Sequence, residues 1–224
     1  MLFTVRFMRR QDIPQVTEID REAFPNEWPP TNFARELVNK LAYYVVAYET
    51  QQADPKPANK PALEGGTSGF LNRLQNLFSR RQTPQDTSSE KEPQILGYAG
   101  MWIMADEAHI TSIASNKNQR HQGIGEGLLI CLIEMAMKYQ ARIVTLEVRV
   151  SNQTAQNLYY KFGFDNLGNR KGYYLDNKED AVIMSTEYIG SPSFREKFRQ
   201  AKQAHYKKWG VTSNETMAKA SGRA

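Results

Sequence analysis

The stretch ITSIASNKNQRHQGIGEGLL, residues 110–129, decides the fold of this 224-residue chain. Its first residues predict a strand over His109–Ala114, and the apolar run after the glycines predicts a helix over Gly123–Tyr139. The glycines let the backbone approach a ligand closely, and the first N–H groups of a helix are unpaired. Such a turn suits a pyrophosphate, and Arg120 adds a positive charge. Glycines that merely start a helix are the equally weighted alternative.

The pattern on either side of this stretch predicts an α/β domain. Alternating or β-branched segments indicate strands, and apolar residues at every third or fourth position indicate helices. The order strand, helix, strand, helix, strand over 109–188 requires at least one parallel crossover. The expected strands are 2–8, Leu41–Tyr48, Ile95–Met104, His109–Ala114, Ile143–Val150, Leu167–Leu175 and Ala181–Tyr188. A first helix is expected to begin at Ile13, with Asp12 as its cap and Phe24 on its apolar side. The other expected helices are Thr31–Lys40, Gly123–Tyr139 and Gln153–Phe162.

Residues 50–94 differ in composition from the rest of the expected domain, which spans 1–190. Five of the ten prolines lie here among Gly, Ser, Gln and Thr, and this composition predicts a disordered insertion. Within it, apolar residues from Phe70 to Phe78 repeat at helical spacing. They predict a short amphipathic helix, which is either transient and without function or docks on a partner or an anionic membrane face.

Residues 191–224 form a basic tail. It holds eight Lys/Arg against two Glu, a net charge of +6, whereas the other 190 residues hold 21 basic and 22 acidic side chains. One helical stripe predicts that the tail is partly helical, and it consists of Phe194, Phe198, Ala201, His205 and Trp209. The charge indicates contact with RNA, the ribosome or an acidic surface, and a terminal helix that is simply packed or solvated is the alternative.

The expected location is the cytoplasm, and no metal is expected. The single cysteine, Cys131, cannot form an internal disulfide, which fits a reducing compartment. The N-terminus shows no apolar signal sequence with a small-residue cleavage site, and no apolar run approaches the roughly 18 residues needed to span a membrane. The three histidines are too scattered along the chain to indicate a metal site.

Two polar residues in the second half are candidates for chemistry. Residues 144–151 alternate between an apolar and a polar face, and Glu147 lies on the polar face. A strand of this kind borders either a cleft or solvent. Tyr159 belongs to the next expected helix, where an aromatic residue is usually part of a core. Taken alone, each residue is more simply explained by structure than by catalysis.

Several motifs together resemble one enzyme family. The stretch 110–129 resembles motif A of the GNAT acetyltransferases, whose core is R/Q-x-x-G-x-G/A, although Lys117 stands where many relatives have proline. LEVRVSNQTAQNLYYKFGF, residues 146–164, is similar to the same region of the RimI-type family, which acetylates the N-terminal alanine of a small-subunit ribosomal protein. RKGYY (170–174) and EDAVIM (179–184) are similar to endings typical of protein N-terminal acetyltransferases. The resemblance covers about 2–49 and 95–188.

The resemblance implies a fold and a site. The GNAT fold is a central mixed, twisted sheet flanked by helices, with a parallel strand pair splayed around acetyl-CoA. Glu147 is implied as general base and Tyr159 as general acid, while Tyr173 and Tyr174 would line the peptide side unless they only pack on an edge strand. Contacts with acetyl-CoA are implied for Ile113, Ala114, Ser115, Arg120, His121, Gln122, Gly123, Ile124, Gly125, Glu126 and Asn152.

The expected reaction is therefore acetyl transfer from acetyl-CoA to the N-terminal α-amino group of a protein. Within the same superfamily, a lysine side chain or a small-molecule amine is the alternative acceptor. An alternative of another class is a non-catalytic CoA-binding module that holds partners through its basic tail. The presence of both Glu147 and Tyr159 argues against that module.

Overall fold

A mixed seven-stranded sheet organises the part of the chain that the computed structural model describes, residues 2–26, 29–50 and 93–210. The strand order is β1-β2-β3-β4-β5-β7-β6, and every neighbouring pair is antiparallel except β4 and β5. This confirms the expected mixed α/β class with one parallel pair. The strands are β1 (Phe3–Phe7), β2 (Ala42–Glu49), β3 (Ile95–Met104), β4 (Glu107–Ser115), β5 (Ile143–Arg149), β6 (Phe164–Arg170) and β7 (Ala181–Thr186).

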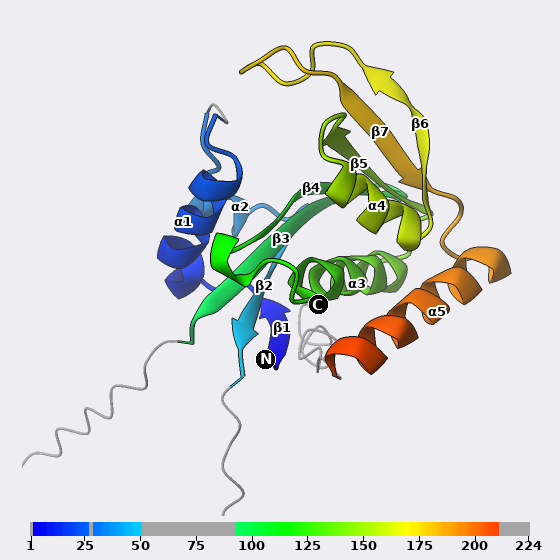
Figure 1. Ribbon diagram of the computed structural model, residues 1–224, viewed down its shortest axis with the longest axis horizontal. Helices are drawn as coiled ribbons and strands as arrows, with labels where there is room; N and C mark the ends of the chain where they lie inside the picture. Colours follow the sequence, from blue (N-terminus) through cyan, green and yellow to red (C-terminus); the bar gives the residue numbers. More distant parts are fainter. Residues whose placement is uncertain (1, 27–28, 51–92, 211–224) are drawn as a thin grey trace, which may run out of the picture. The chain divides into compact units, whose positions relative to one another are not determined.

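Helices cover both faces of this sheet (Figure 1). α3 (Ile124–Lys138) and α5 (Pro192–Trp209) lie on one face, α1 (Ile13–Ala23) and α2 (Phe33–Glu36) on the other, and α4 (Gln153–Lys161) packs on β6. β2 shows why the sheet is apolar on both sides. Val45 and Ala47 join the core under α3, whereas Tyr44 and Val46 join the core under α1, because successive strand residues point to opposite faces.

The parallel pair separates soon after it begins. Only Glu107, Ala108 and His109 of β4 pair with β5, and the last pair is His109 with Thr145. The β3–β4 register then skips Thr111, because Gly100 pairs with Ser112 while Met101 pairs with Ile110. A bulge of this kind bends a strand and increases its twist. From the bulge onward, β4 pairs with β3 alone in the described sheet, which leaves a V-shaped opening between β4 and β5.

The predicted strand Leu167–Leu175 is wrong at both ends. β6 spans Phe164–Arg170 instead, and its pairing with β7 ends at Arg170 opposite Ala181. The chain then turns at Gly172, whose φ is +58° and whose N–H donates to the Asp180 carboxylate at 2.8 Å. Tyr173 and Tyr174 therefore lie in a loop rather than on an edge strand.

Three expectations near the N-terminus also need correction. Asp12 precedes α1 but does not cap it, because its carboxylate accepts two hydrogen bonds from buried Arg6, at 2.6 and 2.8 Å. The helix expected over Thr31–Lys40 is one turn long, since i→i−3 hydrogen bonds to Arg35 and Glu36 tighten the chain after α2. Phe24 ends α1 and is 36% exposed, so it does not join the apolar side.

The basic tail contributes α5 to the same compact unit. Its apolar stripe packs on the α3 side of the molecule, and Phe194, Phe198, Ala201 and His205 are buried. At the expected insertion, Glu49 N–H donates to the Gln94 carbonyl at 3.1 Å, so its two ends meet at the sheet. The helix expected from Phe70 to Phe78 lies outside the described residues.

Candidate active site

The glycine turn lies at the start of α3, beside the V-shaped opening. Gly123 is the N-cap residue with a φ of +80°, a left-handed conformation that strongly favours glycine. At Gly125 a Cβ atom would meet only a Leu158 methyl at 3.7 Å, so space remains beside the turn. Because the first N–H groups of a helix lack intrahelical partners, this turn fits an anionic ligand. Arg120 and His121 are exposed next to it.

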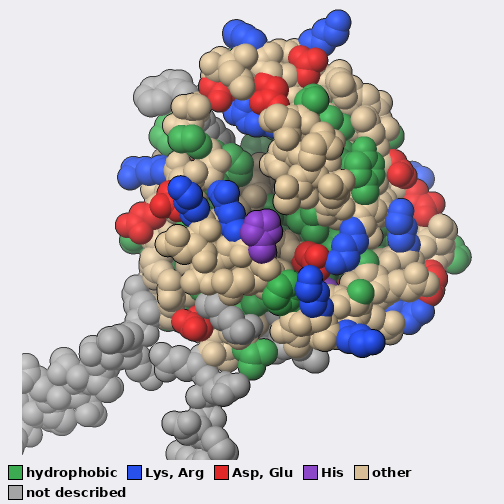
Figure 2. Space-filling model, viewed as in Figure 1, with side chains coloured by type: hydrophobic (Ala, Val, Ile, Leu, Met, Phe, Trp, Pro, Cys, Tyr) green, Lys and Arg blue, Asp and Glu red, His purple; other side chains and the backbone are tan. Residues whose placement is uncertain are grey.

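Charged side chains gather around this region. Figure 2 shows the face as hollowed, with Lys, Arg and His side chains beside the hollow. The acidic residue of the turn, Glu126, is itself engaged by side chains from two other helices. Glu126 accepts from Lys161 Nζ at 2.7 Å and lies 3.0 Å from His205 Nδ1. Burial alone would raise the pKa of Glu126, but these partners outweigh burial and hold it at about 2.

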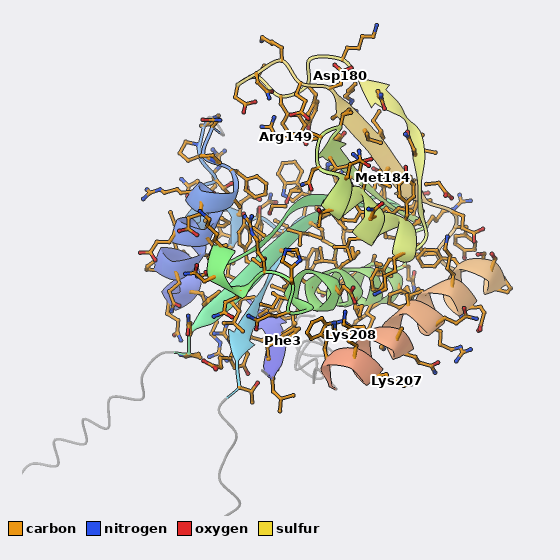
Figure 3. The ribbon with its side chains drawn as sticks, in the orientation of Figure 1. Phe3, Arg149, Asp180, Met184, Lys207 and Lys208 are labelled. Carbon is orange, nitrogen blue, oxygen red and sulfur yellow. The ribbon has the colours of Figure 1, made fainter. Side chains whose placement is uncertain are left out.

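Residues of α5 pack against this glycine turn. A Cβ atom on Gly123 would lie 2.7 Å from the Trp209 ring, so the indole packs directly on the glycine. His205 has no exposed surface in its side chain and joins α5 to Glu126 on α3. Figure 3 labels Lys207 and Lys208 at this end of α5. The tail is therefore part of the support of the glycine turn, which the sequence pattern did not indicate.

Glu147 lies on β5 in the opening between the strands. Its side chain is 9% exposed and its two oxygens have different cationic partners. His109 Nε2 lies 3.2 Å from Oε2, and Arg170 Nη1 lies 3.1 Å from Oε1. A nearly buried carboxylate held at both oxygens has a fixed orientation, which suits a group that must receive a proton at one point in space.

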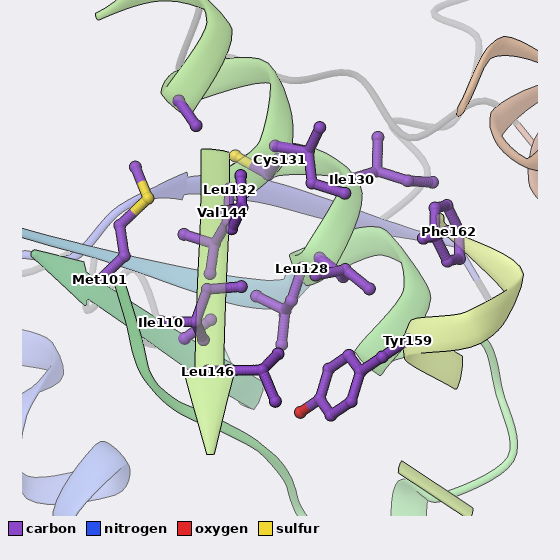
Figure 4. Close-up of a cluster of buried hydrophobic side chains, with 14 of the residues drawn as sticks. Met101, Ile110, Leu128, Ile130, Cys131, Leu132, Val144, Leu146, Tyr159 and Phe162 are labelled. Atoms are coloured by element: carbon purple, nitrogen blue, oxygen red, sulfur yellow. The ribbon is translucent and has the colours of Figure 1, made fainter. Parts of the chain in front are cut away.

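Tyr159 is on α4 and is 8% exposed (Figure 4). Its ring packs against Phe164 with centroids 5.6 Å apart, and in Figure 4 its hydroxyl lies beside Leu146 of β5. Burial raises the pKa of Tyr159, and the nearby Tyr174 raises it further. The hydroxyl therefore keeps its proton across the working pH range and is a donor rather than a base.

The remaining predicted contacts fall into two groups. Ile113, Ala114 and Ser115 form the end of β4 beyond the bulge, where β3 is the only strand neighbour in the described sheet. Backbone groups on the side toward β5 thus face the opening. Asn152 is the N-cap of α4, and its side-chain oxygen accepts from Ala155 N–H at 3.1 Å. One lone pair of that oxygen is used by the helix, so the NH₂ group and the second lone pair of Asn152 are left for a ligand.

The two tyrosines predicted on the peptide side share a loop that Arg149 fixes. The Arg149 guanidinium lies 3.8 Å from the centroid of the Tyr174 ring and also pairs with Asp176 and Glu179. Tyr173 and Tyr174 contact each other edge to face at 5.1 Å. Burial, the largest cause, raises the pKa of Tyr174 to about 12. Figure 3 shows Arg149 and Asp180 at this end of the molecule.

Sequence reasoning missed two residues of this site. The three histidines are scattered along the chain, so the sequence does not single out His109, and Arg170 appears only as the first residue of the RKGYY motif. Both touch Glu147 because β4, β5 and β6 bring together positions 38 and 23 residues away in sequence. The signal in the sequence was weak: His109 and Glu147 each occupy polar positions of expected strands. No group of three or more metal-ligating side chains occurs within the described ranges.

Comparisons with known proteins show the family to which this chain belongs. Residues 64–164 match the model of the Acetyltransferase (GNAT) family. A protein of Bacillus subtilis (strain 168), provisionally named a [ribosomal protein bS18]-alanine N-acetyltransferase, is 36% identical over 181 residues, which is 80% of this chain and 92% of that protein. The chain belongs to the GNAT acetyltransferases of the RimI type. This GNAT protein is thus an acyltransferase, and acetyl-CoA is the donor that its family uses.

A further relative and a solved structure are also similar to this GNAT acetyltransferase. An N-alpha-acetyltransferase of Sulfurisphaera tokodaii is 31% identical over 187 residues, 82% of this chain and 92% of that protein. The crystal structure of the ribosomal-protein-S18-alanine N-acetyltransferase from Escherichia coli superposes with a TM-score of 0.58 at 23% identity, covering 84% of this chain and 94% of that one. The latter likeness shows the shared fold. No helix in the described ranges is long and apolar enough to cross a membrane.

The Glu126 contacts predict a pH-dependent contribution to stability. Because the folded-state pKa is depressed to about 2 from an ordinary 4.5, ionised Glu126 stabilises the fold above about pH 4.5, and this is lost as the pH falls toward 2. Glu126→Gln should lower the free energy of unfolding by about 1–2 kcal/mol at pH 7, after discounting for partial exposure. The difference from wild type should shrink at pH 3. Urea unfolding at both pH values measures it.

Glu187→Gln is the matched control, because Glu187 is exposed and lies beyond the end of β7. Its unfolding free energy should follow that of the wild type at both pH values. An equal loss at pH 7 and pH 3 in Glu126→Gln would mean that the lost stability comes from packing rather than from the ionised carboxylate.

Proposed function

We propose that this acetyltransferase moves an acetyl group from acetyl-CoA to the N-terminal α-amino group of a protein, a ribosomal protein among its candidate substrates. The observation that carries the proposal is the position of Glu147, nearly buried and held at both oxygens in the opening between β4 and β5. The glycine turn at the start of α3 adjoins the same opening. The names of the relatives in Bacillus subtilis and Sulfurisphaera tokodaii support an α-amine as acceptor.

Different residues would hold different parts of acetyl-CoA. N–H groups at Gly123, Ile124, Gly125 and Glu126 would hold the pyrophosphate, with Gln122 and the exposed Arg120 and His121 beside it. The free edge of Ile113–Ser115 would hold the pantetheine arm, with Asn152 across the opening. Acetyl-CoA supplies an acyl group that is activated as a thioester.

The transfer needs one base and one acid. At pH 7 roughly a tenth of an α-amine with a pKa near 7.7–8.0 is unprotonated, against far less of a lysine amine with a pKa near 10.4. Glu147 takes a proton from the attacking amine as nitrogen bonds to the thioester carbon. The carbon–sulfur bond then breaks, and Tyr159 gives its proton to the departing thiolate. Tyr173 and Tyr174 would line the path of the peptide.

The test is acetyl transfer to peptides that differ only in their first residue and in internal lysines. N-terminal products should dominate in mass spectra of the wild-type reaction. Glu147→Gln and Tyr159→Phe should each lower turnover by roughly 10²–10⁴-fold, because each removes a proton-transfer step. Affinity for acetyl-CoA should change little.

Three other outcomes of this test would contradict part of the proposal. Products acetylated only on lysine would overturn the α-amine as acceptor. Normal turnover in both variants would overturn the two catalytic roles. A folded wild-type protein that binds CoA without any transfer would instead support a non-catalytic binding module.

The glycine turn makes a separate prediction about donor binding. A glutamate at position 125 fits sterically, since a Cβ there meets only the Leu158 methyl, but its carboxylate would repel the pyrophosphate. Gly125→Glu should weaken CoA binding at least about tenfold, equivalent to roughly 1.4 kcal/mol, in isothermal titration. Leu167→Glu adds the same charge at a 68% exposed position on β6 and should bind CoA normally. Normal affinity in folded Gly125→Glu would exclude this turn as the pyrophosphate site.

We further propose that the outer face of α5 contacts RNA, because it is a cationic surface on a folded helix. Its apolar side is buried, and five cationic side chains are exposed. Arg199 pairs with Glu196, and the other four are Arg195, Lys197, Lys207 and Lys208. The sequence holds a single cysteine, the buried Cys131, so no disulfide can form within it, and this supports a reducing location such as the cytoplasm.

The α5 proposal is tested by the salt dependence of RNA binding. Binding of a 20-nucleotide single-stranded RNA, followed by fluorescence anisotropy, should weaken with salt. Neutralising the four side chains to Gln should reduce the slope of log K against log salt by about 3, since each phosphate contact contributes about 0.7. Peptide acetylation should stay normal. An unchanged slope, or no binding by the wild type, would exclude this face.

A further inference from the structure

His109 occupies the point where the two parallel strands separate. It is the last β4 residue that pairs with β5, directly opposite Thr145. Neighbouring residues in register across a sheet point to the same face, so the His109 and Thr145 side chains lie side by side. Glu107 and Glu147 are two residues from them on their own strands and share that face. Four polar side chains therefore meet at the base of the opening.

The hydrogen bonds among these side chains have only one consistent direction. Glu107 Oε1 lies 2.5 Å from Thr145 Oγ1, and a carboxylate can only accept, so the single hydroxyl proton of Thr145 points to Glu107. Thr145 Oγ1 also lies 2.9 Å from His109 Nδ1. With its own proton already donated, the hydroxyl oxygen must accept there. His109 Nδ1 therefore carries a proton.

This direction determines what the other ring nitrogen can do. His109 Nε2 lies 3.2 Å from Glu147 Oε2. In a neutral ring protonated at Nδ1, Nε2 is an acceptor, and two lone pairs would face each other across this contact. The contact is favourable when Nε2 also carries a proton and donates it to the carboxylate, which leaves Glu147 able to act as the base. Glu107 and Thr145 thus set the ring so that Nε2 interacts with Glu147 through this proton.

We propose that His109 is a positioning residue of the acetyl transfer, which holds Glu147 through Nε2 while Glu107 and Thr145 fix its protonated Nδ1. The inference rests on the catalytic role proposed for Glu147. Arg170 holds the other carboxylate oxygen from β6, so the two contacts fix the plane of the carboxylate. Without His109, Glu147 could rotate about Arg170, and the atom that receives the amine proton would move.

Two substitutions of His109 separate its two nitrogens. The amide nitrogen of Gln reaches about the position of Nε2, and that of Asn reaches about the position of Nδ1. His109→Gln should keep most of the turnover, because it still donates to Glu147. His109→Asn should lower kcat by roughly 10–10²-fold, the size of effect that misplacing a reacting group has. The KM for acetyl-CoA should be the same in both, since His109 acts on Glu147 and not on the glycine turn.

A double variant shows whether His109 acts through Glu147. In a Glu147→Gln background, His109→Asn should cause less than about a twofold further loss of kcat, because the group it positions is already gone. An equal loss in both backgrounds would overturn the positioning role. Normal kcat in His109→Asn together with an impaired Glu147→Gln would overturn this inference and leave the proposed function intact. Normal kcat in Glu147→Gln would overturn both.

The imidazole nitrogens give a readout that does not depend on activity. The chain has only three histidines, so ¹⁵N NMR of labelled protein contains three ring systems, and the set missing in His109→Asn identifies His109. Nδ1 of His109 should be protonated in the wild type. Thr145→Val, which replaces the accepting hydroxyl with a methyl group of similar size, should shift the ring toward the form protonated at Nε2. An unprotonated Nδ1 in the wild type would overturn the arrangement.

Discussion

The site depends on the early separation of β4 from β5. Strands that stayed paired would place backbone hydrogen bonds where a ligand must enter, and Glu147 would face a closed sheet. The pairing ends at His109 and Thr145, and the bulge at Thr111 turns β4 away while β3 continues to hold it. One local irregularity thus frees a strand edge for the donor and leaves a nearly buried carboxylate at the base of the opening. In the proposed reaction, the strand edge would hold the donor and the carboxylate would act as the base.

Support for the glycine turn beside this opening comes from helices far apart in the sequence. The glycine turn needs a left-handed Gly123, and Trp209 of the terminal helix packs on it. Glu126, which as a free anion would oppose a pyrophosphate, pairs with Lys161 of α4 and contacts His205 of α5. The basic tail thereby has two separate surfaces. The inner side of α5 packs against the glycine turn, and its outer side carries the exposed cationic side chains for which we propose contact with RNA.

Local pattern was sufficient to predict most elements and the family. The motifs in 110–129 and 146–164 depend on residues close in sequence, and their helices, strands and glycine turn appear where expected. Errors occurred where contacts distant in sequence override local preference. Asp12 sits at a helix start but serves the buried Arg6, and the strand expected to reach Leu175 ends at Arg170 because Asp180 holds the turn at Gly172.

The sequence by itself determined the mixed α/β fold, the family and the residues Glu147 and Tyr159 as candidates, because backbone periodicity and short motifs are properties of neighbouring positions. Only the tertiary structure decided which groups surround those candidates. His109 and Arg170 reach Glu147 from two other strands, and His205 and Trp209 reach the glycine turn from a helix nearly eighty residues later. Strand order and register create these contacts, and neither is encoded in the spacing of residues along one segment.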